Sequence, residues 1–283
     1  MATLLVHISL LAYAAGAAAF LTWLVKPGPR WVRLGRLLLV AGVLLHFGAF
    51  GVALGSADAN VAAVGLGAGE WKGGQLFSLL AAITVAGYLL LDWRYDLPVA
   101  GAFVAPFTVA VMVPAHLVAS SAHAVAPRVA HSALLFVHVG AAALGTAALG
   151  LAFGLSLLYL ASEKQVKSKR PGRLLARLPS LDLIDKAGYR LAVWGFVFLS
   201  LTIATGSLVS RASTGTVLPL APKQGFAILA WGLFAALIQA RLVAGWRGRR
   251  VAMLVITGFV LLAGTYVGIL TAPALHATVA AAP

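Results

Sequence analysis

Eight long apolar stretches, separated by short polar segments, dominate the chain. They lie near residues 3–25, 34–55, 75–91, 97–118, 130–160, 189–210, 224–243 and 251–272. About 20 apolar residues in helical conformation cross a bilayer core of about 30 Å, so each stretch is a candidate span. The third is short, and the fifth is long enough to tilt or to extend beyond the bilayer. The stretches lack an alternating pattern, which predicts helices rather than a barrel.

Composition supports a single membrane domain over residues 1–283. Hydrophobic residues make up 61% of the chain and charged residues 10%, whereas soluble proteins average about 45–50% and about 25%. Residues 1–25 are predicted to be the first span rather than a secretory signal, because no basic region precedes the apolar run. We expect an all-α integral membrane protein with about eight transmembrane helices and no separate soluble domain.

The basic residues alternate from one polar segment to the next. Of the 21 lysines and arginines, 17 follow the odd-numbered stretches, and the rest are Lys72, Arg128, Arg211 and Lys223. Basic residues accumulate on the cytoplasmic side, so the alternation predicts both termini outside. The net charge of +14 is then an orientation signal, and no nucleic-acid partner is expected. The basic inner segment 163–188 is predicted to be a cytoplasmic loop, which lies against anionic lipid headgroups or docks a cytoplasmic protein.

Several chemistries are disfavoured by the residues themselves. The chain has no cysteine, so thiols in any reaction must come from another protein. The glycine-rich run 65–69 has no preceding strand and no following Lys-Ser/Thr, which argues against a nucleotide site. Every acidic residue lies in a loop or at a span edge, which places a carboxylate-driven transporter lowest among the function classes.

Histidine is the exception, because the predicted topology puts all seven histidines at or beyond the bilayer middle on the outer side. His46 lies about 18 Å along its span, at 1.5 Å per residue, and a titratable group near the midplane is functional by default. His131 and His138 are two helical turns apart and share one face of the fifth span. Neutral imidazole is the usual protein ligand of haem iron. A histidine at a helix end is more often an interfacial hydrogen-bonding residue, the role we assign to His7 and His123.

The second half of the chain resembles the cytochrome c assembly family of CcsA/ResC type. The resemblance rests on short blocks in a specific order. These are Gly101-Ala102-Phe103 with Pro106, Leu135-Phe136-Val137-His138-Val139, Leu178-Pro179-Ser180-Leu181, Tyr189-Arg190, Gly245-Trp246-Arg247-Gly248-Arg249-Arg250, and Leu275-His276. Together they run from about residue 98 to residue 276.

The resemblance implies a protein of the bacterial cytoplasmic membrane that handles haem b and presents or relays it at the outer face for attachment to apocytochrome c. It implies that His138 and His276 are the two outer axial ligands of the haem iron, and that His46 matches a second-span histidine of many members. Supporting contacts are expected from His116 and His131, and propionate partners are expected among Arg128, Arg211 and Lys223. It also implies a partner membrane subunit with a large outer domain.

Two features depart from the family pattern. The tryptophan-rich haem-presenting segment, typically Trp-x-Trp-Asp-Pro-Lys-Glu-Thr-Trp, is replaced by Leu218-Pro219-Leu220-Ala221-Pro222-Lys223-Gln224-Gly225-Phe226, and Gln239 stands where the seventh span often has a histidine. We therefore predict a divergent member of HemX/YpjD type. If the protein is an enzyme, it is a haem–cytochrome c lyase. The alternative is a non-catalytic adaptor or regulator that acts through the inner segment 163–188.

Overall fold

The computed structural model describes residues 1–55, 73–117, 133–168, 179–216 and 222–280. Every regular element in these ranges is a helix. The helices are α1 (Ala2–Val25), α2 (Pro29–Gly55), α3 (Gly73–Tyr95), α4 (Pro98–Leu117), α6 (Ala133–Lys167), α7 (Leu181–Thr214), α8 (Pro222–Val243) and α9 (Arg249–Ala280). Six of them are long and apolar enough to cross a membrane, and α4 adds a shorter apolar stretch, Pro98–Val113. The prediction of an all-α membrane protein with several spans is confirmed.

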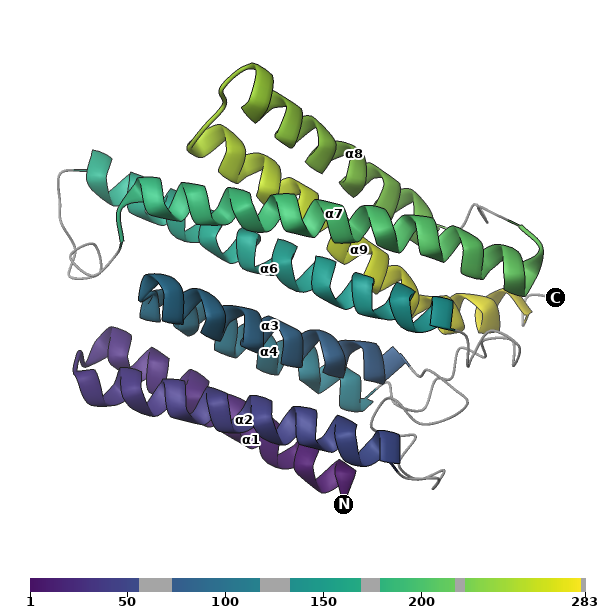
Figure 1. Ribbon diagram of the computed structural model, residues 1–283, viewed down its shortest axis with the longest axis horizontal. Coiled ribbons are helices and arrows are strands. Elements are labelled where there is room, and N and C mark those ends of the chain that lie inside the picture. Colours follow the sequence, from purple (N-terminus) through teal and green to yellow (C-terminus); the bar gives the residue numbers. More distant parts are fainter. Residues whose placement is uncertain (56–72, 118–132, 169–178, 217–221, 281–283) are drawn as a thin grey trace.

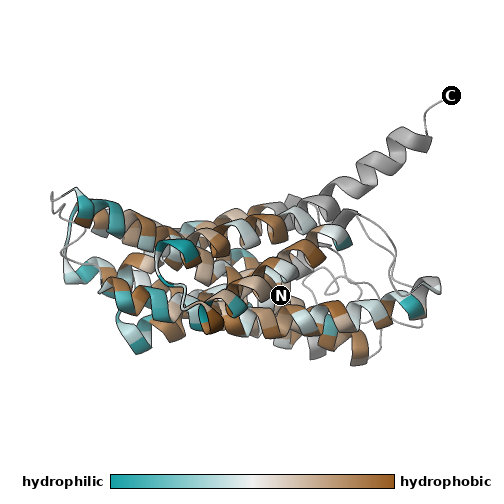
Figure 2. Cartoon of the chain, turned by 90° about the horizontal axis from the view of Figure 1, so that it is seen from above, coloured by the Kyte–Doolittle hydropathy of each residue, from teal (hydrophilic) through white to brown (hydrophobic). Residues whose placement is uncertain are grey.

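The helices form four antiparallel pairs, stacked in one direction as α1/α2, α3/α4, α6/α7 and α8/α9 (Figure 1). The connections α1–α2, α3–α4 and α8–α9 lie at one end of the bundle, and the N-terminus lies at the other (Figure 1). Figure 2 shows hydrophilic residues at the end with the connections and hydrophobic residues along the middle of the helices. The connections correspond to basic segments of the sequence, so we refer to this end as the inner end.

Helix α6 joins the two halves of the bundle. Leu151, Leu155 and Leu158 on one face belong to the apolar core that α1–α4 build. Leu149 and Ala152, on the opposite face, belong to the core shared with α7, α8 and α9. A helix that is apolar on all sides is typical of such a central position.

The third helix is longer than the predicted third span, 75–91, because its inner end carries a buried charge. Asp92 accepts hydrogen bonds from Arg36 Nε at 2.6 Å and Nη2 at 3.0 Å. It also accepts one from the backbone N–H of Leu97 at 2.8 Å, which begins the turn into α4. Since the carboxylate is neutralised by α2, α3 continues through it to Tyr95.

Two helices extend into the segment 163–188, which the sequence predicts to be a basic cytoplasmic loop. Helix α6 extends to Lys167, and α7 begins at Leu181. Ser180 caps α7, because its side chain accepts a hydrogen bond from Leu183 N at 3.3 Å, and Asp182 adds a negative charge to the first turn. The part between, 169–178, lies outside the described residues.

Candidate functional site

His138 lies on the second turn of α6, at the outer end of the bundle, and faces α7. Its Nδ1 is 3.0 Å from the backbone oxygen of Thr202 and 3.2 Å from Oγ1 of Thr205. The side chain is partly exposed. Helix α7 therefore binds one ring nitrogen of His138, while part of the side chain stays exposed at the surface of the protein.

The two contacts fix the tautomer of a neutral His138. A carbonyl oxygen accepts hydrogen bonds and cannot donate them. Nδ1 must therefore carry the hydrogen of the bond to the Thr202 carbonyl. The Thr205 hydroxyl donates its own proton to the Leu201 carbonyl at 2.7 Å, so its oxygen is also an acceptor towards Nδ1. The lone pair of the imidazole therefore resides on Nε2, which is the state in which histidine binds a metal.

A glycine makes the approach of α7 to His138 close. A Cβ on Gly206 would lie 2.9 Å from the ring Cε1 and 3.3 Å from Nδ1. The absence of a side chain at this position lets the ring lie directly on the α7 backbone. Sequence reasoning missed Thr202, Thr205 and Gly206, although two threonines and a glycine within five residues of an apolar helix were a signal for a close helix contact.

His46 lies in the other half of the bundle and is fully buried. Its Nε2 is 2.7 Å from Ser78 Oγ on α3, and its Nδ1 is 3.3 Å from Tyr13 Oη on α1. Its ring stacks on Phe50, with ring centroids 5.1 Å apart. Both ring nitrogens thus have side-chain partners, which fits an interhelical hydrogen-bond centre. The predicted role of His46 in haem binding stays a prediction, and a direct contact between its ring and an iron would require one of these partners to move.

We expect Ser78→Ala to lower the free energy of unfolding by about 1–3 kcal/mol, because a buried imidazole nitrogen loses its partner. Thermal unfolding of the purified protein in mild detergent measures this effect. The matched control is Ser207→Ala on α7, where the hydroxyl donates to the Ile203 carbonyl of its own helix. Equal, small shifts in both variants would contradict a central role of the His46 hydrogen bonds.

Besides His138 and His46, Arg211 is the predicted site residue whose side chain the structure describes. Arg211 is exposed in the last turn of α7. Helix α9 runs to Ala280, so the backbone at His276 is helical, whereas the sequence analysis ended this span at 272. The side chains of His276, His116 and Lys223 are not among those described, and Arg128, His123 and His131 fall in the undescribed range 118–132.

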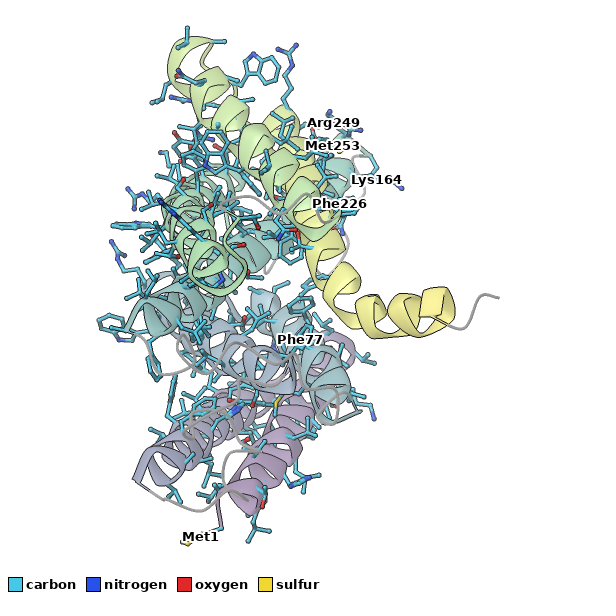
Figure 3. All side chains as sticks on the ribbon, turned by 90° about the vertical axis from the view of Figure 1, so that its right-hand side faces the viewer. Met1, Phe77, Lys164, Phe226, Arg249 and Met253 are labelled. Carbon is cyan, nitrogen blue, oxygen red and sulfur yellow. The ribbon has the colours of Figure 1, made fainter. Side chains whose placement is uncertain are left out.

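The two departures from the family pattern have different surroundings. Gln239 is exposed on α8. Phe226, at the position of the last tryptophan of the family segment, lies against α9 (Figure 3), with ring carbons 3.2–3.4 Å from the position of a Cβ on Gly264. Further along α8, Trp231 Nε1 donates to Ser200 Oγ on α7 at 2.9 Å, and its ring stacks on Phe196. Aromatic side chains thus hold α8 against both α7 and α9.

A further cluster lies at the inner end of the second half. Asp185 of α7 pairs with Arg241 of α8 at 2.8 Å and accepts a hydrogen bond from Gly248 N at 2.9 Å. The Arg241 guanidinium lies 4.1 Å from the centre of the Tyr189 ring. Asp185 lies in α7 rather than in the predicted loop, and its two contacts join α7 to α8 and to the α8–α9 turn.

Comparison with known proteins agrees with this architecture. The solved structure of the cytochrome c haem lyase CcmF superposes with a TM-score of 0.65 at 14% sequence identity, covering 96% of this chain and 49% of that one. The chain therefore spans about half the length of that protein, and the likeness concerns the fold. The apolar helices and the bacterial relatives described next indicate a multi-pass protein of the bacterial cytoplasmic membrane.

Sequence relatives are bacterial cytochrome c biogenesis proteins. The CcsA protein of Prochlorococcus marinus (strain MIT 9301) is 29% identical over 220 residues, covering 69% of this chain and 70% of the relative. The CcsA protein of Prochlorococcus marinus (strain AS9601) is 31% identical over the same shares of the two chains. The CcsA protein of Gloeothece citriformis is 35% identical over 104 residues, 37% of this chain and 32% of the relative. The family model described as cytochrome C assembly protein matches residues 73–274, so this chain belongs to the cytochrome c assembly protein family.

Proposed function

We propose that this protein binds haem at the outer end of its bundle during cytochrome c assembly, with Nε2 of His138 as one axial ligand of the iron. The observation that carries the proposal is the contact between His138 Nδ1 and the Thr202 carbonyl at 3.0 Å. A neutral ring that donates Nδ1–H to this carbonyl keeps its lone pair on Nε2, the atom that would bind the iron. Histidines that ligate metals almost always donate their other ring N–H to a carbonyl, carboxylate or water, so the residues present fit this ligand role.

The second proposed ligand is His276 on α9. Helices α6 and α9 pack together, and Phe153 of α6 stacks on Phe259 of α9 with ring centroids 4.8 Å apart. His138 is 15 residues from Phe153 towards the outer end, and His276 is 17 residues from Phe259 in the same direction. His138 therefore lies near the start of α6 and His276 near the end of α9, so both are towards the outer ends of two helices that pack together. This placement supports a pair of imidazoles that hold one iron.

The chain's own contribution is to bind and orient haem, and the thiols must come from elsewhere. Bound haem supplies the porphyrin side chains to which apocytochrome thiols are joined. The protein has no cysteine, so we propose an apocytochrome c and a partner membrane subunit as its associates. Lyase activity of its own and the narrower HemX/YpjD-like assignment stay predictions, because the relatives named above are CcsA proteins.

The absorption spectrum of detergent-purified protein tests the proposal, as isolated, after haemin addition and after dithionite reduction. We expect a Soret band and sharp reduced bands for the wild type. Removing a residue that hydrogen-bonds a metal ligand typically weakens metal binding by about 10–100-fold. His138→Ala and His276→Ala each remove a proposed ligand itself, so each should weaken haem binding by more than that.

The matched control is His7→Ala, which removes an exposed histidine whose Nδ1 bonds to Thr3 O of its own helix at 2.7 Å. We expect its spectrum to equal that of the wild type. A wild type that stays colourless with added haemin overturns the proposal and favours the adaptor hypothesis. Full haem binding by His138→Ala removes His138 from the site even if the protein does bind haem.

A further inference from the structure

The strongest unassigned feature near the proposed site is the group on α7 that holds the His138 ring. It consists of the Thr202 carbonyl, the Thr205 hydroxyl and the bare Cα of Gly206, and we call it the α7 cradle. We infer that Thr205 is a positioning residue for His138, which sets the orientation and the donor strength of Nε2. This inference rests on the proposed function and specifies how the same site is tuned.

The hydrogen bonds around Thr205 give its oxygen one role. The residue is buried, with 6% exposure. Its hydroxyl proton is directed to the carbonyl of Leu201 at 2.7 Å, with a longer contact to the Thr202 carbonyl at 3.3 Å. Because the proton points back along α7, a lone pair of the same oxygen is left for Nδ1–H of His138 at 3.2 Å.

Two acceptors on one N–H restrain the ring more than one acceptor would. A single bond to the Thr202 carbonyl permits the imidazole to swing about that contact, whereas a second acceptor one turn along α7 removes this freedom. Acceptors on Nδ1–H also increase the electron density at Nε2, which strengthens its bond to a metal. Thr205 thus acts on the iron through His138 and does not itself need to touch haem.

Thr205→Val is the informative substitution because valine has nearly the shape of threonine and lacks the oxygen. We expect the dissociation constant for haemin to rise about tenfold, the lower end of the usual effect of such contacts. The midpoint potential of the bound haem should also rise, because a weaker imidazole donor stabilises ferric iron less. Thr205→Ser keeps the oxygen and should restore both values.

The chain offers a matched control outside the α7 cradle. Thr84 on α3 is buried, with 2% exposure, and its hydroxyl donates to the Leu80 carbonyl of its own helix at 2.7 Å. Thr84→Val therefore makes the same chemical change at a buried threonine of a helix that does not hold His138. We expect its haemin affinity and midpoint potential to equal those of the wild type.

The experiment is haemin titration of the full-length haem-free protein in detergent, followed by redox titration of each complex. Equal values for wild type, Thr205→Val and Thr84→Val overturn the inference while leaving haem binding standing. A wild type that binds no haemin overturns the proposed function and this inference with it. If Thr205→Val does not fold, Thr205→Ala provides a smaller variant without the hydroxyl, and wild-type affinity in that variant also overturns the inference.

Discussion

Asp92→Asn is expected to lower the free energy of unfolding by about 3 kcal/mol, whereas Asp96→Asn is expected to change it by no more than about 1 kcal/mol. The two aspartates contact the same guanidinium, that of Arg36, from neighbouring turns of one helix end. They differ in burial, because the Asp92 side chain is 4% exposed and the Asp96 side chain 83%. The pair therefore compares a buried and an exposed partner with one identical substitution.

The size of the Asp92 effect follows from its three donors. One carboxylate oxygen accepts Arg36 Nε, and the other accepts both Arg36 Nη2 and Leu97 N. An asparagine turns one of these oxygens into an NH₂ group that faces a donor, and it leaves the exposed Asp96 as the countercharge of Arg36. Breaking a buried ion pair typically costs about 3–5 kcal/mol. Arg36 is one-third exposed, which favours the lower end of that range.

Thermal or denaturant unfolding in detergent measures both variants against the wild type. Asparagine is chosen for Asp96 because this residue has a positive φ of 49°, a conformation that asparagine tolerates better than other non-glycine residues. Similar losses in the two variants would show that exposure does not decide the strength of this cluster. A loss confined to Asp92→Asn supports the buried carboxylate as the link between α2, α3 and the α3–α4 turn.

Gly206→Ala is expected to weaken haem binding by about 10–100-fold. The new methyl group would lie 2.9 Å from Cε1 of His138, closer than carbon atoms normally approach. Either the ring leaves the α7 cradle or α7 moves away from α6, and overpacking of this kind typically costs about 1–3 kcal/mol. Both responses break the contact between Nδ1 and the Thr202 carbonyl, so the effect should appear in haem affinity as well as in stability.

Gly140→Ala on α6 is the matched control, two residues from His138. A Cβ at this position meets nothing within 4 Å, so its haemin titration should match that of the wild type. Unchanged affinity in Gly206→Ala would mean that the ring of His138 does not need its place on α7. Reduced affinity in both variants would indicate a general sensitivity of α6 to substitution rather than a specific contact.

Several properties followed from the sequence because they depend on neighbouring residues in the chain. Runs of apolar residues about 20 long have one compatible structure in a membrane, so the helical class and the order of the elements were predictable. The alternation of basic residues predicted which connections share an end of the bundle, and the short turns lie together as expected (Figure 1). Histidine chemistry, together with the family blocks, predicted His138 as a candidate iron ligand from the sequence.

Helix ends were less predictable, since they depend on how charges are compensated. The apolar pattern of α3 stops before Asp92, and only Arg36 from α2 shows why the helix continues. The inner segment had the composition of a loop, yet α6 extends into it, and the Ser180 cap starts α7 within it. A charged residue at the end of an apolar run predicts the end of a helix. This prediction fails where a partner far along the chain compensates the charge.

The sequence by itself determined the membrane class, the helical elements and the residue types able to ligate a haem iron. The tertiary structure decided which ring nitrogens of those residues are engaged in hydrogen bonds with neighbouring helices. His46 receives partners from α1 and α3 on both ring nitrogens, whereas within the described part of the chain the partners of His138, 64 and 67 positions away, contact Nδ1. The tautomer of a histidine, and hence which ring nitrogen carries the lone pair, is set by its hydrogen-bond partners. Helix packing brings these partners together from distant positions, so the sequence alone does not predict the tautomer.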